Sequence, residues 1–572
     1  MLKDEAIDVF ENWPYHVPVY EEMKGEFEAL VQALKTAKSG EEALSVYQKM
    51  ADLSDQIQDD VTHVQVLFSL ETQNPTYQKG MDSLNRDLPL FQVEEQNFAK
   101  AMLSSPYRPF LEEKLGKFLF EQYEYSFRSF DDRVVEEAQE EANLVMQYDA
   151  SVAGTNVLFR GKTYNLPQMG KFLSSADYAT RHEAALAYYG EMAKHVEEWE
   201  SFYDKLVKVR VKMAKKLGYD SYTELAYYRM NRYDYTPEMV KQYRERIRQA
   251  VTPLANRLVE RQLKQLGIEN PSLVDLNLHF AHGNPLPKGT TEEKIRSAIQ
   301  MYDAMSPETS YFFRFMVDHH LLFLEAKPGK QSGGYMTEFP IHRCPIIFSN
   351  FNGTSGDVDV LTHEFGHSFQ YFEARDIAIP PYRMPTAESC EIDSMSMEFF
   401  AEPYMSLFFD DADGYRYLHL ADAVEFLPYG VTVDEFQHWV YDHPEASPKE
   451  RDEEWQRLEE RYTPWKVRLE QNIPYLKEGH RWLTQAHIFD LPFYYIDYTL
   501  AQVIAFQFLL RDRVNHQEAW NTYLTLCRMG GKYPFLTLLK KAGLDSPFAE
   551  GTLEKTIAPL EEILLSYQPS SR

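Results

Sequence analysis

The chain has 572 residues, 44% of them hydrophobic and 26% charged, which is enough for more than one core of an ordinary folded protein. A formal net charge of −29 argues against nucleic-acid binding, and no apolar run approaches the roughly 18 residues of a membrane-spanning helix. The acidic start Met1–Ala6 argues against a secretory signal. The three cysteines, Cys344, Cys390 and Cys527, are far apart in the sequence, which fits a reducing compartment without structural disulfides. We therefore expect a cytoplasmic protein.

Most of the chain is predicted to be helical, because apolar residues recur at three- and four-residue spacing with charged residues between them. Breaks are expected where glycine or proline interrupts this pattern. The clearest helical segments are Val19–Thr36, Glu41–Phe68, Asp131–Tyr148 and Met239–Leu266, and the clearest breaks are Ser39–Gly40, Asn74–Pro75, Ser105–Pro106, Gly267–Pro271 and Gly283–Gly289.

Strand signals are few and local. The segment Val157–Asn165 is typical of a hairpin that turns at Arg160–Gly161, and Gly333–Phe339 and Pro345–Phe351 are typical of short strands. The last of these is a candidate for pairing with an extended peptide. A turn-rich loop and then a helix follow it. We therefore expect a mainly α fold with a small β-sheet beside one helix.

The segment His363–His367 fits the pattern H-E-x-x-H. On a helix, residues four apart lie on one face, so both imidazoles can reach one metal ion. Glu364 borders that face, which suits a general base that takes a proton from water activated by zinc. The competing interpretation is coincidence on a surface helix. It is disfavoured because Val358–Phe372 has helical periodicity and because a strand precedes it.

A catalytic zinc site needs a third protein ligand and an open position. Glu373 stands where one class of such enzymes has a third histidine, so the third ligand should come from a later helix. One carboxylate of that helix can be the ligand, and another can orient a histidine. The competing interpretation is a solvated acidic face, which the apolar residues between the carboxylates disfavour. The candidates are Glu388, Glu391, Asp393 and Glu398.

Four stretches resemble the thimet oligopeptidase family, most closely its bacterial oligoendopeptidase F-like branch. They are Pro345–Thr354, His363–Phe369, Glu391–Glu398 and His487–Tyr498. The resemblance is specific across about 330–505. Family members are zinc peptidases built of two helical lobes around a deep, narrow channel that admits short peptides and excludes folded proteins. The resemblance implies the same architecture and activity here.

The resemblance also implies roles for single residues. Glu391, Ser394 and Glu398 match the family's Glu-x-x-Ser-x-x-x-Glu motif, which selects Glu391 over Glu388 as the third zinc ligand. A histidine and tyrosines stabilise the developing negative charge on the carbonyl oxygen in this family. The best matches are His487, Tyr495 and Tyr498, although the spacing leaves open whether Tyr494 or Tyr495 is the partner of Tyr498. The competing interpretation is that these tyrosines are ordinary core aromatics. We expect His480, which precedes this stretch, to be a surface or satisfied histidine.

The expected protein is therefore a zinc-dependent oligoendopeptidase with one Zn²⁺ ion, Glu364 as general base and short peptides as substrates. Residues 1–155 are expected to form an N-terminal helical region of the channel wall, and residues 156–572 the catalytic region, with lobes not contiguous in sequence. Two alternatives are a catalytically inactive peptide-binding protein of the same fold and a metalloenzyme that hydrolyses another bond. No nucleic-acid or membrane partner is expected, and the oligomeric state and cleavage preference are left open.

Overall fold

The computed structural model describes residues 7–327, 329–331, 333–469 and 473–568, so the acidic start Met1–Ala6 lies outside the described residues. The described chain is mainly helical, with five short strands, which confirms the expected fold class. None of the helices in this part of the chain is long and apolar enough to cross a membrane. The three cysteines are free, as expected for a chain without structural disulfides.

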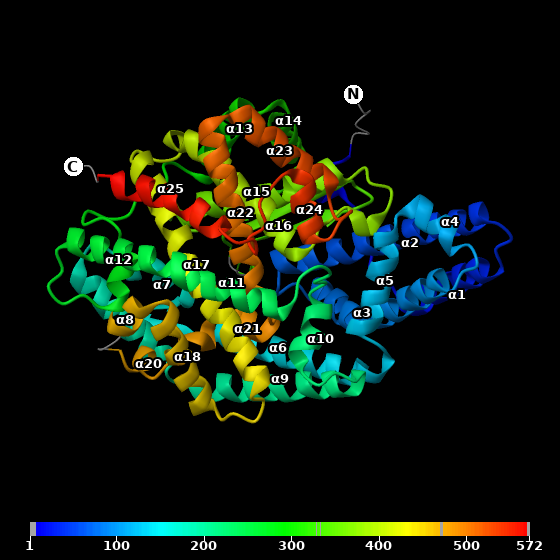
Figure 1. Ribbon diagram of the computed structural model, residues 1–572, viewed down its shortest axis with the longest axis horizontal. Helices are drawn as coiled ribbons and strands as arrows, with labels where there is room; N and C mark the ends of the chain where they lie inside the picture. Colours follow the sequence, from blue (N-terminus) through cyan, green and yellow to red (C-terminus); the bar gives the residue numbers. More distant parts are fainter. Residues whose placement is uncertain (1–6, 328, 332, 470–472, 569–572) are drawn as a thin grey trace.

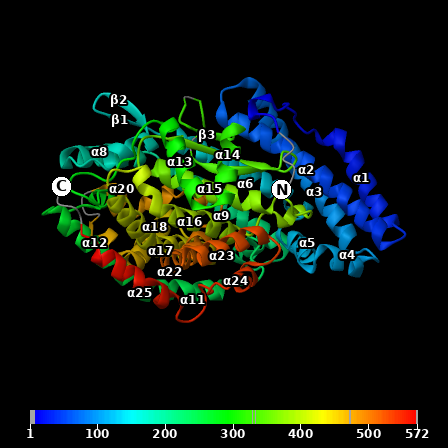
Figure 2. The same ribbon diagram turned by 90° about the horizontal axis from the view of Figure 1, so that it is seen from above.

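The N-terminal helices form a cluster with its own hydrophobic core. Phe27, Leu84 and Phe98 are among its buried residues. Helix starts follow the predicted signals: the Ser39 hydroxyl accepts a hydrogen bond from the backbone N–H of Glu42, and Pro75 occupies the first turn after the Asn74 cap. The cluster comprises α1 (Tyr20–Thr36), α2 (Gly40–Leu70), α3 (Pro75–Leu103), α4 (Arg108–Leu115) and α5 (Lys117–Ser129), which lie at one end of the molecule in Figures 1 and 2.

The next helix, α6 (Val135–Gly154), packs into the main body. Its residues Leu144 and Tyr148 belong to the main core, and it lies against α9 (Val196–Leu217). The expected boundary at residue 155 stays a prediction, but the packing of the core changes between Ser129 and α6, before that boundary.

Three buried helices dominate the centre of the main body. Helix α16 (Ala387–Ala401) packs between α15 (Gly356–Ala374) and α22 (Tyr495–Val514). Helix α22 is buried along most of its length, from Ile496 to Leu509, so neighbouring elements surround it. Helix α17 (Ala412–Asp442) packs against α22 as well. This arrangement places segments far apart in sequence against one another.

The predicted helical segment Met239–Leu266 is two helices. Helix α11 (Pro237–Ala250) ends before Val251, and α12 (Thr252–Leu266) begins directly after it. The break occurs here because Pro253 has no N–H with which to continue the first helix. The other α-helices are α7 (Leu166–Leu173), α8 (Tyr178–Met192), α10 (Tyr222–Arg229), α13 (Thr291–Met305), α14 (Pro307–Asp318), α18 (Pro448–Tyr462), α19 (Pro464–Leu469), α20 (Pro474–Lys477), α21 (Ala486–Asp490), α23 (His516–Met529), α24 (Phe535–Ala542) and α25 (Thr552–Ser566). Short 3₁₀ helices connect some of these elements, among them η6 (His480–Thr484).

Two small sheets account for the described strands. The predicted hairpin is confirmed as β1 (Asn156–Phe159) and β2 (Lys162–Asn165), and both turn residues have positive φ. The second sheet has the order β3-β5-β4, with bounds Leu322–Glu325 for β3, Tyr335–Phe339 for β4 and Cys344–Phe351 for β5.

The position of β5 corrects one expectation. It is the central strand, pairing with β3 in parallel and with β4 antiparallel, so both of its edges are occupied. The strand at Pro345–Phe351 therefore has no edge to offer a peptide. Strand β4 is at the edge of the sheet and is the strand that can offer one. The sequence did not predict β3, a short apolar run directly after a helix.

Candidate metal centre

The two histidines of the H-E-x-x-H segment lie one turn apart on α15, with ring centroids 4.9 Å apart. The glycine between them brings the next helix close. A Cβ atom at Gly366 would lie 2.5 Å from the backbone oxygen of Asp393 and 2.6 Å from the Cα of Ser394 on α16. Only glycine permits this contact, because any side chain would force the two helices apart. The close approach of α15 and α16 at Gly366 places Glu391 next to the two histidines.

The three predicted metal ligands come together. His363 Nε2 is 3.3 Å and His367 Nε2 is 3.6 Å from Glu391 Oε2. A tetrahedral ion with bonds of 2.0–2.1 Å separates its ligands by about 3.3 Å, so these atoms are spaced as ligands of one ion. Two imidazole nitrogens and a carboxylate oxygen are a donor set that suits zinc.

The charges of the cluster suit a cation. Burial raises the pKa of Glu391, but His367 and His363 more than offset this, and the resulting pKa is about 2. Burial lowers the pKa of His367 to about 4. Glu391 is therefore an anion and His367 a neutral imidazole at neutral pH, which are the protonation states that bind metal. Burial lowers the pKa of His363, but its hydrogen bonds to Glu391 and Glu398 more than offset this and raise the pKa well above its ordinary value, so a metal ion would displace a proton there.

A further carboxylate orients the first histidine. His363 Nδ1 donates to Glu398 Oε1 at 2.6 Å, which leaves Nε2 turned to Glu391. The second oxygen of Glu398 lies 2.6 Å from Nε2 of His419 on α17. Glu398 thus has the orienting position predicted for one of the α16 carboxylates. The sequence did not indicate His419, because it lies on a separate helix with no local motif.

The other two carboxylate candidates lie elsewhere. The Glu388 side chain is 1% exposed and lies near Asp497 and Arg232. Asp393 accepts a hydrogen bond from the Cys527 thiol. Burial raises the pKa of both carboxyls well above the ordinary value. Neither belongs to the cluster of His363, His367 and Glu391.

Glu364 lies beside the cluster, 8% exposed. Burial raises its pKa to about 7, and the Glu391 carboxylate adds to this rise. The backbone N–H of Met336 on β4 hydrogen-bonds to the Glu364 carboxyl. The edge strand of the sheet therefore faces the predicted general base.

Of the two tyrosines between which the sequence does not decide, Tyr494 is the one whose hydroxyl contacts a predicted metal ligand. Its hydroxyl donates to Glu391 Oε1 at 2.5 Å, and Tyr498 follows one turn later with its hydroxyl 3.3 Å from His487 Nε2. The ring of Tyr495 packs against Phe426 and Tyr429 of α17, and also against His487 and Tyr498, with centroid distances of 5.2 and 5.5 Å. Tyr494 rather than Tyr495 thus reaches the cluster, because it is the cap residue before α22 begins and its side chain is directed toward α16.

Two residues that the sequence did not indicate continue this chain of contacts. Gln485 Nε2 lies 3.0 Å from His487 Nδ1, and the Tyr429 hydroxyl donates to Gln485 Oε1 at 2.7 Å. With the amide group donating to Nδ1, the proton of a neutral His487 is on Nε2, which faces Tyr498. Gln485 is two residues before His487, but a lone glutamine gives no sequence signal.

Two cavities adjoin this centre from the side of the N-terminal helices. One of about 530 Å³ is lined by Tyr494 and the start of α16, and one of about 320 Å³ is lined by Glu338 of β4 and Tyr371 of α15. Tyr123 of α5 and Met384 line both cavities. Together they form hollows between the N-terminal cluster and the main body.

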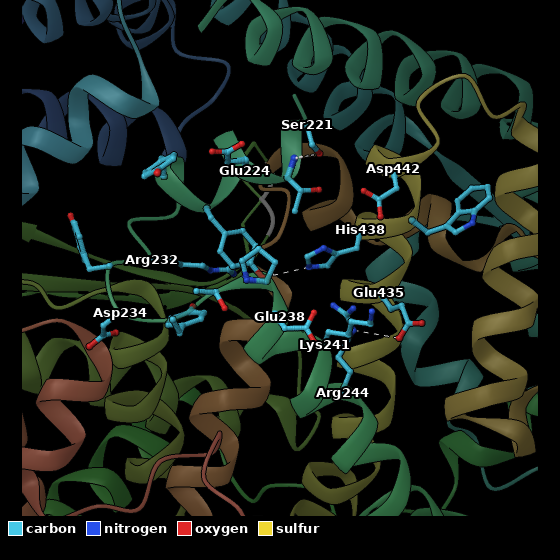
Figure 3. A pocket seen from close by; sticks show the side chains of 18 of the residues that line it. Ser221, Glu224, Arg232, Asp234, Glu238, Lys241, Arg244, Glu435, His438 and Asp442 are labelled. Carbon is cyan, nitrogen blue, oxygen red and sulfur yellow. Dashed lines mark hydrogen bonds and ion pairs between the residues drawn. The ribbon is translucent and has the colours of Figure 1, made fainter. Parts of the chain in front are cut away.

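A separate cavity of about 850 Å³ lies between α10, α11 and α17 (Figure 3). Arg232, Arg244 and His438 line it, and Arg232 also contacts Asp497 of α22 at 3.0 Å. Its lining includes none of the metal-cluster residues, and, unlike the other two cavities, it includes neither Tyr494 nor a residue of β4, so we do not assign it to the candidate centre.

Comparisons with known proteins agree on one family. The model of the peptidase M3 N-terminal domain matches residues 10–130, and that of peptidase family M3 matches residues 297–557. Oligopeptidase PepF of Bacillus subtilis (strain 168) is 20% identical over 334 residues. That match covers 56% of this chain and 48% of PepF, so the chain spans about half the length of this curated relative.

Solved structures match over almost the whole chain. A structure of PZ peptidase A with an inhibitor is 41% identical, covers 98% of this chain and 99% of its own, and has a TM-score of 0.94. A protein assigned as oligoendopeptidase F from Bacillus anthracis strain Ames is 41% identical, covers 99% of both chains and has a TM-score of 0.91. Oligoendopeptidase-F from Enterococcus faecium, at 16% identity and a TM-score of 0.59, shares the fold.

Proposed function

The chain belongs to peptidase family M3, a family of metallopeptidases that use a divalent metal ion, and from this premise we propose that it is a zinc-dependent oligoendopeptidase. It hydrolyses internal bonds of short peptides. The observation that carries the proposal is the convergence of His363, His367 and Glu391 at ligand spacing, with the carboxyl group of Glu364 beside them.

His363, His367 and Glu391 would hold one Zn²⁺ ion, with Glu398 orienting His363. When bound, the ion would polarise the scissile carbonyl group and lower the pKa of a water molecule beside it. Tyr494, whose hydroxyl contacts Glu391, also lines the hollow of about 530 Å³, so there is room for a substrate next to these ligands on the side of the N-terminal helices.

Glu364 is the proton carrier of the reaction. Its carboxylate accepts a proton from the attacking water and delivers that proton to the amine nitrogen of the leaving peptide. The raised pKa of Glu364, about 7, supports both halves of this transfer, because a group that titrates near the working pH can accept and then donate.

His487 and Tyr498 donate hydrogen bonds to the carbonyl oxygen as negative charge develops on it. Burial raises the pKa of Tyr498, so the hydroxyl keeps its proton at neutral pH. Tyr494 acts on a different atom: its hydrogen bond holds Glu391 in the ligand position. The ring of Tyr495 packs between α17 and the His487–Tyr498 pair, so we assign it the support of these two donors and not a hydrogen bond of its own to the substrate.

The hollows support short, extended peptides as substrates. Strand β4 is at the sheet edge, and its Met336 backbone faces Glu364, so a peptide that pairs with β4 would pass the candidate centre. The adjoining cavities of about 530 and 320 Å³ offer room for side chains of such a peptide. The N-terminal cluster would then form one wall of a channel, as expected for residues 1–155.

The alternative is a peptide-binding protein that has lost catalysis. The complete set of ligands, general base and carbonyl-oxygen donors disfavours it. The test is hydrolysis of an internally quenched peptide of about ten residues, with chelator and with zinc added back. We expect chelator-sensitive cleavage at an internal bond, and none of a folded protein substrate.

Glu364→Gln provides the matched control, because it removes the base without removing a ligand. Metal-loaded wild-type protein that cleaves nothing across a mixed peptide library would overturn the proposal. It would favour the binding protein instead.

A further inference from the structure

A second cluster with metal-ligand spacing lies outside the catalytic centre. It joins Glu200 of α9, Asp452 of α18 and His480 of η6, and the three candidate ligand atoms lie within 4.8 Å of one another. Within the described residues, this cluster and the catalytic one are the two sets of this kind. Of the two expectations for His480, a surface position does not hold, since its side chain is 12% exposed, whereas its contact with Asp452 agrees with a satisfied histidine.

The spacing matches that of the catalytic ligands. His480 Nε2 is 3.4 Å from Asp452 Oδ2, between the values of 3.3 and 3.6 Å at the catalytic cluster. A charge-assisted hydrogen bond would be about 2.7–2.9 Å. Hydrogen-bonded histidine–carboxylate pairs elsewhere in this protein range from 2.6 Å for His363 with Glu398 to 3.3 Å for His195 with Glu198. His480 and Asp452 are thus spaced as two ligands of one ion of the zinc type.

The surroundings fix both side chains in these positions. The Trp482 indole N–H donates to Asp452 Oδ1 at 2.9 Å, which leaves Oδ2 turned to His480. Gly479 has a φ of +89°, and a Cβ atom there would meet the backbone oxygen of Asp452 at 2.7 Å. The glycine therefore makes the turn that brings His480 against α18. Such outer contacts are typical of oriented metal ligands.

Two carboxyl groups and one imidazole meet in this cluster, and the neighbouring arginine is engaged elsewhere. Arg451 donates a hydrogen bond to Asp204 at 3.1 Å. His480 Nδ1 is buried without a hydrogen-bond partner, 3.8 Å from Glu478. A bound cation would lie between the two carboxyl groups and Nε2 of His480.

We propose that Glu200, Asp452 and His480 bind a second divalent transition-metal ion of the zinc type, separate from the catalytic centre. One imidazole with two carboxylates suits Zn²⁺ or Co²⁺, whereas Ca²⁺ and Mg²⁺ prefer oxygen ligands alone. The ion ties η6 to α9 and α18.

The position of the cluster gives this ion a structural effect. Trp482 of η6 packs against Phe489 of α21, with ring centroids 5.9 Å apart, and α21 carries His487. An ion that fixes η6 therefore stabilises the segment that leads to His487. The expected effect is on the stability of this segment and not on the bond-breaking step.

The test counts metal equivalents. Metal-free protein is titrated with Zn²⁺ against a chelating indicator, and Co²⁺ absorption spectra report the ligand set of each equivalent. We expect two equivalents in the wild type and one in His480→Gln. The affinity for the second equivalent should fall by more than about 10-fold in that variant. Glu391→Ala should keep the equivalent that His480→Gln loses.

His342→Gln is the matched control. His342 Nδ1 pairs with Asp59 Oδ2 at 2.8 Å, so this variant removes a half-buried histidine–carboxylate pair that is no part of either cluster. It should keep both equivalents. If His480→Gln does not fold, Glu200→Gln takes its place, because Glu200 is half-buried and at the edge of the cluster.

Thermal unfolding supplies a second readout. Excess Zn²⁺ should raise the Tm of wild-type protein whose catalytic site is already filled, and should not raise that of His480→Gln. A single equivalent in the wild type with no Tm shift would overturn the proposal, and so would two equivalents in His480→Gln. No peptide is cleaved in these measurements, so their outcome is independent of the proposed oligopeptidase activity.

Discussion

The catalytic cluster and the second cluster share ligand types and spacing but differ in how the chain builds them. The first uses two neighbouring helices, α15 and α16, held together at Gly366. The second draws one residue each from α9, α18 and η6. Around the first lie a proton acceptor, Glu364, and hydroxyl donors; around the second lie an indole donor and a tight turn. Converging ligands are sufficient to bind an ion, whereas catalysis also needs groups that move protons and stabilise charge.

The largest expected effect comes from removing a ligand of the first cluster. Glu391→Ala should lower metal affinity at that cluster by more than about 100-fold and abolish turnover, because a three-ligand site becomes a two-ligand site. Glu388→Ala, which changes a buried carboxyl on the same helix, should keep the metal. Metal content of the two variants after dialysis decides between them. Equal loss in both would mean that α16 positions its carboxylates differently from the arrangement described here.

The next effect separates binding from catalysis within the first cluster. Glu364→Gln should reduce kcat by about 10²- to 10⁴-fold and leave both metal equivalents in place. The amide is similar in shape to the carboxyl but cannot accept the proton. Single-turnover hydrolysis, with metal content measured on the same samples, tests this. Residual activity within a few fold of wild type would exclude Glu364 as the proton carrier.

A third change tests the donors that only the first cluster has. In Gln485→Glu, a carboxylate replaces the amide beside His487 Nδ1 and would accept a hydrogen bond from it, so neutral His487 would carry its proton on Nδ1 and not on Nε2. The donor toward the substrate then exists only while His487 is protonated. The introduced carboxylate would also raise the pKa of His487, which burial lowers in the wild type.

The direction of the pH dependence of kcat follows from the position of the proton on His487. In Gln485→Glu, kcat should fall as the pH rises through the raised pKa of His487, reaching a loss of about 10²- to 10³-fold when His487 is neutral. Wild-type protein keeps the Nε2 proton in its neutral form and should lack this fall. The pH profiles of kcat for the two proteins give the comparison, and Tyr429→Phe, which only loosens Gln485, should show a smaller loss with no new pH dependence. Superimposable profiles for the wild type and Gln485→Glu would contradict the assigned tautomer.

The smallest effect concerns orientation of a ligand. Glu398→Gln should lower the metal affinity of the first cluster by about 10- to 100-fold, because His363 loses its charged hydrogen-bond partner but stays in place. The second cluster should be unaffected, which makes it an internal reference in the same titration. An unchanged first equivalent would show that α15 alone fixes the ring of His363.

The sequence predicted those parts of the protein that depend on local geometry. A helix places residues four apart on one face, so the pairing of His363 with His367 follows from the chain itself, as does the hairpin at Arg160–Gly161. The break at Val251 was missed because apolar periodicity continues through it, although Pro253 was a visible signal. The choice of Glu391 over Glu388 came from a family resemblance, since spacing alone allowed both.

The tertiary structure alone decided contacts between distant segments. It gave Tyr494 and not Tyr495 the contact with Glu391, placed β5 in the centre of its sheet, and brought Glu200 to Asp452 and His480. Periodicity states which side of a helix is buried but not which neighbour covers it. That neighbour is set by packing over the whole chain, where the contact of Gly366 with α16 fixes distances that no local pattern contains.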